Sequence, residues 1–295
     1  MPLLICAFSY VALATQSLPP IRQVIARHGL SARKSLGQHF LLDLNLTRKI
    51  VRAAQIGRGV TVLEIGAGPG GLTRALLESP AAKIIAVERD PRAIGALHEL
   101  ALVSGDTLEV VKGDALKLNV EEIIDHPTQI VANLPYNIGT RLLLRYLSTS
   151  KRFERMTLLF QKEVADRLAA SPGSRAYGRL SVIVQWLCEV RVLFDIPAKA
   201  FTPEPKVVSS VVDLVPRDQP LATANKSSLE LVTRAAFGQR RKMLRTSLKA
   251  LHVDSRTLLN AAGVSPTARP EEISVSDFCS LSRALDTVVD WKTKD

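Results

Sequence analysis

Short apolar runs alternate with segments of helical period through the first half of the chain. A run that is rich in Val and Ile and is bounded by Gly, Asp or Asn is typical of a buried strand. Four such runs occur, at 60–65, 83–87, 108–111 and 129–132. Each is too short for a helix and ends in a polar or glycine residue, so each predicts a strand.

Helices are expected around these runs. One runs through 51–54, one opens over 72–77, and one begins at Asp90-Pro91, where Asp is suited to the N-cap and Pro to the first helical position. Regular alternation of strand and helix predicts an α/β fold of the Rossmann-like type, with a parallel sheet covered on both faces. Ligands of such sheets bind outside the carboxyl ends of the strands.

The pattern changes in the second half of the chain. Two further strands are expected at 156–160 and 207–215, with a helix at 182–188. Polar residues 217–228 read as a linker, and helices follow, including 237–251 and 275–289. The sequence therefore predicts three parts: a dispensable N-terminal extension (1–19), an α/β domain (20–216) and a small helical domain (217–295).

Composition narrows the class of protein. The chain has 295 residues, is 46% hydrophobic and carries a formal net charge of +11, so we expect a globular protein with a polyanionic partner, nucleic acid before membrane. A merely soluble basic protein is the alternative. Its three cysteines, Cys6, Cys188 and Cys279, form no CxxC pair, which signals neither a metal site nor a disulfide framework and suits a reducing, cytoplasmic location.

The first residues of the chain are apolar. Residues 2–15 are too few to span a membrane and lack the leading positive charge of a signal peptide, since the first basic residue is Arg22. We expect a dispensable extension rather than a targeting signal. No other segment has the length of a transmembrane helix, so no membrane partner is expected.

A glycine-rich turn follows the first predicted strand. Gly66, Gly68 and Gly71 satisfy the GxGxxG spacing, which fits several nucleotide-binding folds and is weak evidence by itself. Glu88 ends the next strand, where a carboxylate can accept both ribose hydroxyls, and Asp114 follows the third, where it can accept from an adenine amine. Asp114 could instead be a helix N-cap. Two acids at successive strand ends nevertheless favour a nucleotide site.

The fourth strand leads into Asn133-Leu134-Pro135-Tyr136. An Asn side-chain oxygen and a neighbouring backbone carbonyl can accept the two N–H groups of an exocyclic amine. The Tyr ring can stack on the base that carries the amine. The alternative is a strand end, a turn and a packed Tyr.

The glycine turn and the turn after the fourth strand together indicate whether the ligand is a methyl donor or a dinucleotide. A dehydrogenase needs a proton donor and a nicotinamide pocket, whereas the fourth strand ends in an amide and an aromatic ring. Pro69 also removes a backbone donor from the glycine turn that a pyrophosphate could use. S-adenosyl-L-methionine has no phosphate, so the pattern favours it as the cofactor.

With these motifs in order, the chain resembles Rossmann-like adenine-N6 methyltransferases. Further motifs are similar to those of the KsgA/RsmA family of small-subunit ribosomal RNA adenine dimethyltransferases: 36–41 (LGQHFL), 161–164 (QKEV), 177–181 (YGRLS), 201–207 (FTPEPKV) and 237–242 (FGQRRK). The resemblance covers about residues 20–285. It implies transfer of four methyl groups to two adjacent adenosines near the 3′ end of 16S rRNA, in the small ribosomal subunit or its precursor, by a monomer.

The resemblance also implies roles for individual residues. His39 and Leu41 contact the donor, and Gly66 approaches it through its backbone. Glu88 holds the ribose, Asp114 the adenine, and Asn133 lies between donor and target amine. Family members carry Asn or His at the position of His39, so we set aside the alternative of a general base.

In this interpretation the amine is oriented rather than deprotonated. Asn133 and the carbonyl of Leu134 or Pro135 accept from N6, so that its lone pair points at the methyl group, while Tyr136 stacks the base. Positioning of this kind contributes about 7–11 kcal/mol in well-oriented reactions. Phe201 is a candidate for the second face of the base sandwich, with ordinary core packing as its alternative.

The rest of the RNA would be bound outside the methyl-transfer site, through its phosphate groups. The candidates Arg240, Arg241, Lys242, Arg245 and Lys249 fall on the helix expected at 237–251, and Arg33, Lys34, Arg152 and Arg155 add charge. A solvated helix face is the alternative for some of them.

Two rival functions remain at this stage. An Erm-type methyltransferase of 23S rRNA shares the fold and the Asn-x-Pro-Tyr turn, although the motifs at 177–181, 201–207 and 237–242 argue against it. A non-catalytic nucleic-acid binder, such as an assembly factor or a transcription factor derived from this fold, would be expected to have lost Glu88, Asp114 or Asn133, and all three are present.

Overall fold

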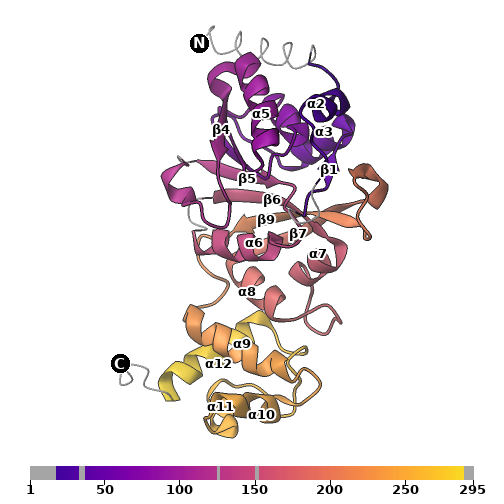
Figure 1. Ribbon diagram of the computed structural model, residues 1–295. Coiled ribbons are helices and arrows are strands. Elements are labelled where there is room, and N and C mark those ends of the chain that lie inside the picture. Colours follow the sequence, from indigo (N-terminus) through magenta and orange to yellow (C-terminus); the bar gives the residue numbers. More distant parts are fainter. Residues whose placement is uncertain (1–17, 33–36, 125–126, 150–152, 289–295) are drawn as a thin grey trace. The chain divides into compact units, whose positions relative to one another are not determined.

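The computed structural model describes residues 18–32, 37–124, 127–149 and 153–288 (Figure 1). They divide into two compact units. The first contains the described residues up to Ala165 together with Arg191–Pro216, and the second contains Asp166–Val190 together with the described residues from Arg217 onward. The segment 166–190 thus groups with the C-terminal helices, although the sequence analysis placed it in the α/β domain. Residues 1–17 of the expected extension lie outside the described residues.

The first unit is built on a seven-stranded sheet with the strand order β4-β3-β2-β5-β6-β9-β7. The strands are β2 (Thr61–Ile65), β3 (Lys83–Glu88), β4 (Leu108–Lys112), β5 (Thr128–Ala132), β6 (Phe153–Gln161), β7 (Cys188–Ile196) and β9 (Ser209–Pro216). The neighbouring strands β4, β3, β2, β5 and β6 are all parallel, and β9 is antiparallel to β6. In Figure 1, β5, β6, β9 and β7 can be followed side by side. The order reverses between β2 and β5, which creates a crevice at the carboxyl ends of these strands.

The central strands are buried on both sides. Every residue of β2 and β5 is buried, as the continuous apolar runs predict for strands covered on two faces. One hydrophobic cluster joins α3 and α4 to this sheet, with Ile50, Leu76 and Val62 among its members. The predicted α/β fold is confirmed, and the predicted parallel sheet holds for β4-β3-β2-β5-β6, whereas β9 adds to it antiparallel.

Two helices of the first unit, α3 and α5, begin at an Asp side chain that caps them. The helices of this unit are α2 (Ile21–Arg27), α3 (Leu44–Ala53), α4 (Gly71–Leu77), α5 (Pro91–Ser104) and α6 (Gly139–Ser148), while α7 (Lys162–Leu168) crosses the unit boundary. The Asp90 side chain accepts from the Arg92 backbone N–H at the start of α5, with Pro91 in the first turn, as predicted. Short 3₁₀ turns occur at Gly105–Thr107, Val120–Glu122 and Ala198–Ala200.

A separate two-stranded sheet pairs β1 (Phe40–Leu41) with β8 (Phe201–Thr202). The pairing is antiparallel and places Leu41 opposite Phe201. It joins the segment that leads into α3 to the segment that precedes β9. Two motifs that lie about 160 residues apart in the sequence are thereby brought together.

The second unit is helical. Its helices are α8 (Arg179–Leu187), α9 (Lys226–Gly238), α10 (Leu244–Ser247), α11 (Ser255–Ala261) and α12 (Val275–Val288), with a 3₁₀ turn at Leu248–Leu251. Phe237 stacks on Phe278 and meets Tyr177 edge-on inside its core. No described helix in either unit has the length and apolar character needed to cross a bilayer.

The single helix expected at 237–251 is wrong. α9 ends at Gly238, and residues 239–243 are not helical; a turn over 239–241 precedes the four-residue α10. The backbone N–H groups of Leu244 and Arg245 donate to Ala268 and Pro266 instead of continuing a helix. Tertiary hydrogen bonds and a glycine at the helix end therefore override the local helical pattern.

Candidate active site

A cleft opens at the carboxyl ends of β2, β3, β4 and β5 in the first unit. Its walls come from 37–41, the glycine turn after β2, the ends of β3 and β4, and the turn after β5. Every residue that the sequence analysis assigned to the donor or to the reaction lines it: His39, Leu41, Gly66, Glu88, Asp114, Asn133, Leu134, Pro135 and Tyr136.

Glycine is required in the turn after β2. Gly66, Gly68 and Gly70 have φ values of 72°, 56° and 89°, in the left-handed region that side chains rarely adopt. A Cβ on Gly71 would lie 2.5 Å from the Leu41 carbonyl oxygen. The first turn of α4 can therefore approach strand β1 only because this residue has no side chain. The turn therefore presents bare backbone to the cleft.

Glu88 is held by backbone donors. Its Oε2 accepts from the Gly68 N–H at 2.8 Å, and its Oε1 accepts from the N–H groups of Arg89 and Asp90 at 2.7 and 2.8 Å. These bonds fix a buried carboxylate at the edge of the glycine turn. One acceptor position on Oε2 is left for a ligand hydroxyl.

Asp114 forms a turn rather than a helix cap. Its Oδ1 accepts from the Leu116 N–H at 3.0 Å, and its Oδ2 lies 3.6 Å from Nη1 of Arg89. No helix starts there; the next residues form turns. Arg145, which sequence reasoning missed, reaches from α6 to this loop and donates to the carbonyls of Ala115, Leu116 and Leu118.

The amide of Asn133 is oriented by a contact from the N-terminal part of the chain. Its Nδ2 donates to the His39 carbonyl at 2.8 Å, which leaves Oδ1 as the acceptor of this side chain. The Pro135 carbonyl already accepts from the N–H groups of Ile138 and Gly139. Because two donors already fill the Pro135 carbonyl, we expect the Leu134 carbonyl, of the two considered from sequence, to accept a further N–H.

Tyr136 is fixed at both ends of its side chain. Its hydroxyl shares a short hydrogen bond with Ser209, and its ring stacks on His39 with centroids 5.2 Å apart. Burial raises the pKa of the phenol, so Tyr136 stays neutral. The His39 Nδ1–H donates to the Pro203 carbonyl at 2.7 Å, which ties the 201–207 motif to the cleft. Sequence reasoning had no signal for Ser209.

Acidic side chains outnumber basic ones in the cleft. Among the described lining residues, Glu88 and Asp114 are carboxylates, Arg89 is a cation, and Glu64 is a buried acid. Burial raises the pKa of Glu64 from 4.5 to about 8, with the Thr73 hydroxyl bond opposing the shift and the Glu88 charge adding to it. Such a lining repels a pyrophosphate and suits a ligand that carries positive charge.

Phe201 does not line the cleft. Its side chain is 3% exposed and packs in the core cluster with Leu41 and Ile196. The structure therefore favours the packing alternative over a stacking role. Its place opposite Leu41 in the β1–β8 pair explains why an aromatic ring at this position is internal.

The basic residues divide into paired and exposed groups. Arg240 pairs with Glu271, whereas Arg241 and Lys242 are exposed and have no partner among the described residues. Arg155 is partly buried, and its guanidinium contacts Asp213 and Gln55. The expected contributions of Arg33, Lys34 and Arg152 lie outside the described residues.

Comparisons with known proteins agree with this geometry. The family model for ribosomal RNA adenine dimethylases matches residues 29–287. A protein of Paramagnetospirillum magneticum named ribosomal RNA small subunit methyltransferase A is 60% identical over 91% of this chain and 95% of its own length. A Rhodospirillum rubrum protein of the same name is also 60% identical, over 91% and 93%.

Two solved structures share the fold. A dimethyladenosine transferase from Plasmodium falciparum is 28% identical, with a TM-score of 0.72, over 84% of this chain and 98% of its own. The 23S rRNA methyltransferase ErmE is 26% identical, with a TM-score of 0.63, over 84% and 99%.

Proposed function

The chain belongs to the ribosomal RNA adenine dimethylase family, and we propose that it methylates N6 of two adjacent adenosines near the 3′ end of 16S rRNA. The product is N6,N6-dimethyladenosine, and the methyl donor is S-adenosyl-L-methionine. The substrate is the small ribosomal subunit or its precursor, in the cytoplasm, and the enzyme acts as a monomer. The names of the relatives support the choice of subunit.

The observation that carries this proposal is the orientation of Asn133. Since its Nδ2 is occupied by the His39 carbonyl, its Oδ1 is presented as an acceptor. Together with the Leu134 carbonyl it can take both N–H groups of an adenine amine. Accepting both bonds draws the nitrogen away from planarity and frees its lone pair for attack. No general base is needed, because the proton can leave to water after transfer.

The residues of the cleft fit the donor. The backbone of the glycine turn can approach it closely, Glu88 keeps an acceptor position for a ribose hydroxyl, and Asp114 lines the same cleft and can accept from an adenine amine. When bound, S-adenosylmethionine supplies an electrophilic methyl group on a sulfonium. The excess of carboxyl groups over cations favours this positively charged ligand over a dinucleotide.

Tyr136 holds the base. Its ring is fixed by Ser209 and His39 before any substrate arrives, so little ordering is required on binding. A base stacked on an aromatic side chain contributes about 1–3 kcal/mol. In this proposal, orientation and stacking supply most of the rate enhancement, as precise positioning does in well-oriented intramolecular reactions.

The test is methyl transfer from labelled S-adenosylmethionine to unmethylated small subunits, large subunits and naked 16S rRNA in parallel. Nucleoside analysis should find dimethyladenosine on the small subunit. Label on the large subunit would instead support the Erm-type function, which shares this fold. Donor binding without any transfer would support a role in binding or assembly.

A further inference from the structure

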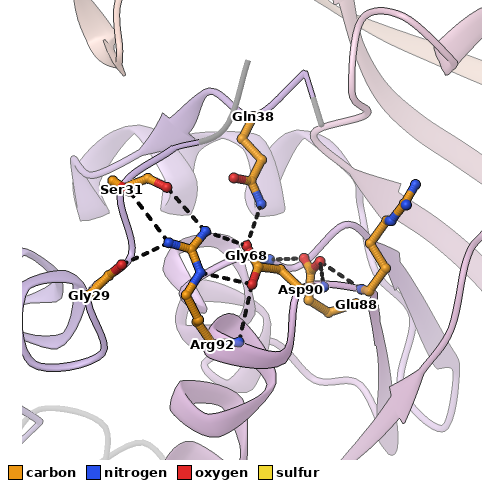
Figure 2. Close-up of polar contacts among 8 residues, drawn as sticks. Gly29, Ser31, Gln38, Gly68, Glu88, Asp90 and Arg92 are labelled. Atoms are coloured by element: carbon orange, nitrogen blue, oxygen red, sulfur yellow. Dashed lines mark hydrogen bonds and ion pairs between the residues drawn. The ribbon is translucent and has the colours of Figure 1, made fainter. Parts of the chain in front are cut away.

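Gln38 lies in the wall of the cleft and contacts a charged pair behind that wall. It lines the cleft together with His39, and its Nε2 donates to Oδ2 of Asp90 at 3.3 Å (Figure 2). Asp90 is only 2% exposed and does not line the cleft. A buried carboxylate at this position needs a compensating cation.

Arg92 supplies that cation. Its Nε donates to Oδ1 of Asp90 at 3.1 Å and its Nη2 to Oδ2 at 2.7 Å, a two-pronged pairing within the first turn of α5. The hydrogen bonds from Arg92 are the main reason that the pKa of Asp90 falls to about 2. Asp90 therefore remains an anion at neutral pH and can hold the Gln38 amide.

The same guanidinium reaches the chain that precedes the cleft wall. Its Nη1 donates to the Gly29 carbonyl at 2.8 Å and its Nη2 to the Ser31 carbonyl at 3.2 Å, as Figure 2 shows. A planar group with five N–H donors can make all these bonds at once, whereas the single ammonium of lysine cannot. Arg92 thus links residues 29–31 to Asp90, and through Asp90 to Gln38.

The network also reaches Glu88. The backbone N–H of Asp90 donates to Oε1 of Glu88, and Oε2 of Glu88 accepts from Gly68 (Figure 2). One continuous set of hydrogen bonds therefore runs from residues 29–31 through Arg92 and Asp90 to the glycine turn. It links Gln38 in the 37–41 wall to Glu88 and the glycine turn, which line the same cleft.

We propose that Asp90 and Arg92 are positioning residues of the donor site. They hold Gln38, and with it the 37–41 wall, at the distance from Glu88 that donor binding requires. The inference rests on the proposed function of the cleft as a donor site. Neither residue lines the cleft, so both act through Gln38 and Glu88.

The test measures the Kd of S-adenosylmethionine and of S-adenosylhomocysteine by calorimetry on the full chain. Arg92→Leu should raise both Kd values about tenfold, the effect of losing about 1.4 kcal/mol of binding free energy. The kcat at saturating donor should fall by a smaller factor than the Kd rises, because the network bonds to Gln38 and Glu88 directly and reaches Asn133 and Tyr136 only through His39 in the same wall.

A matched control separates positioning from general destabilisation. Arg48 pairs with Glu78 in the same two-pronged way, with bonds of 2.7 and 2.8 Å, but lies outside the cleft. Arg48→Leu should leave the donor Kd unchanged. If Arg92→Leu does not fold, Arg92→Lys keeps the charge and should still raise the Kd, by a smaller factor.

A double-mutant cycle with Gln38→Ala gives a readout that a merely structural role would not move. If Arg92 acts through Asp90 and Gln38, the double variant should bind the donor about as well as the weaker single variant. Fully additive losses, or a donor Kd within twofold of wild type in Arg92→Leu, would overturn the inference alone. Absence of donor binding by the wild-type chain would overturn the proposed function, and this inference with it.

Discussion

Nε of Arg240 lies 2.7 Å from a carboxylate oxygen of Glu271, and the same guanidinium donates to the Ser174 carbonyl. This residue belongs to a run of three cations that the sequence analysis treated as one RNA-contacting group. The structure separates them, because Arg241 and Lys242 are exposed and Arg240 joins two segments of the helical unit. Substitution of Arg240 should therefore change stability, whereas substitution of Arg241 and Lys242 should change RNA binding.

Arg240→Ala should lower the free energy of unfolding by about 1–2 kcal/mol, since it removes charge-assisted hydrogen bonds inside the second unit. Reversing the charge of Arg241 and Lys242 to Glu should leave stability unchanged and weaken binding to small subunits. The slope of log K against log salt should fall by about one for each phosphate that the variant no longer neutralises. Thermal unfolding and binding at several salt concentrations check both effects. Unchanged subunit binding in the double Glu variant would make this turn a solvated surface.

Asn133→Ala should abolish methyl transfer while donor binding and small-subunit binding stay within a few-fold of wild type. The variant removes the Oδ1 acceptor and also the bond to the His39 carbonyl. Single-turnover transfer at saturating donor and subunit measures the loss directly. Near-normal turnover would show that Asn133 does not orient the amine, and that the Leu134 carbonyl does not act together with it.

Ser209→Ala should slow transfer by acting on the acceptor base. It removes the hydroxyl that pairs with Tyr136, and a missing hydrogen bond of about 1 kcal/mol corresponds to roughly a fivefold fall in kcat/KM for the RNA. The donor Kd should not change. Ser210→Ala is the matched control, because that neighbouring hydroxyl donates to Asp195 instead. Equal effects of the two variants would show a general loss of strand packing rather than a role of the Tyr136 ring.

The residues at strand ends could be predicted from sequence because local pattern and chemistry coincide there. A run buried on both faces stops at Glu88 or Asn133, and parallel strands bring such ends to one edge. β7 was not predicted, since it alternates apolar residues with Glu189, Arg191 and Asp195 and is largely half-exposed or exposed. Its pairing with β9, rather than its own composition, makes it a strand.

The supporting contacts of the site have no local signature at all. Gln38 and Asp90 are 52 residues apart, and Asn133 and His39 are 94 apart. Each pair depends on how the wall at 37–41 is laid against the sheet, which no spacing in the sequence encodes. Phe201 illustrates the opposite case, in which a motif residue resembles a stacking platform until its burial is known.

Arg145→Ala should weaken the hold on the adenine of the donor. Its guanidinium donates to three carbonyls of the loop that carries Asp114, so its removal leaves that loop without a clamp. We expect the Kd of S-adenosylmethionine and of free adenosine to rise by similar factors, about 3- to 10-fold for the loss of one or more hydrogen bonds. Arg141→Ala, on the exposed side of the same helix, is the control. A change in the donor Kd with unchanged adenosine binding would place the effect outside the adenine loop.

Glu64→Gln should change how stability depends on pH. The pKa of this carboxyl is about 8 in the fold against 4.5 ordinarily, mainly because it is buried. Between these values the folded chain keeps a proton that the unfolded chain has released, so Glu64 makes stability fall as pH rises from about 4.5 to 8. The fall can reach about 1.4 kcal/mol per pH unit for one group. The amide of the variant cannot ionise and can still accept from the Thr73 hydroxyl. Urea unfolding without donor at pH 5, 6.5 and 8 should therefore show the variant gaining on the wild type as pH rises. If the stabilities of variant and wild type instead change in parallel with pH, Glu64 is already ionised in the folded chain. The cleft would then carry one more negative charge than it does with a protonated Glu64.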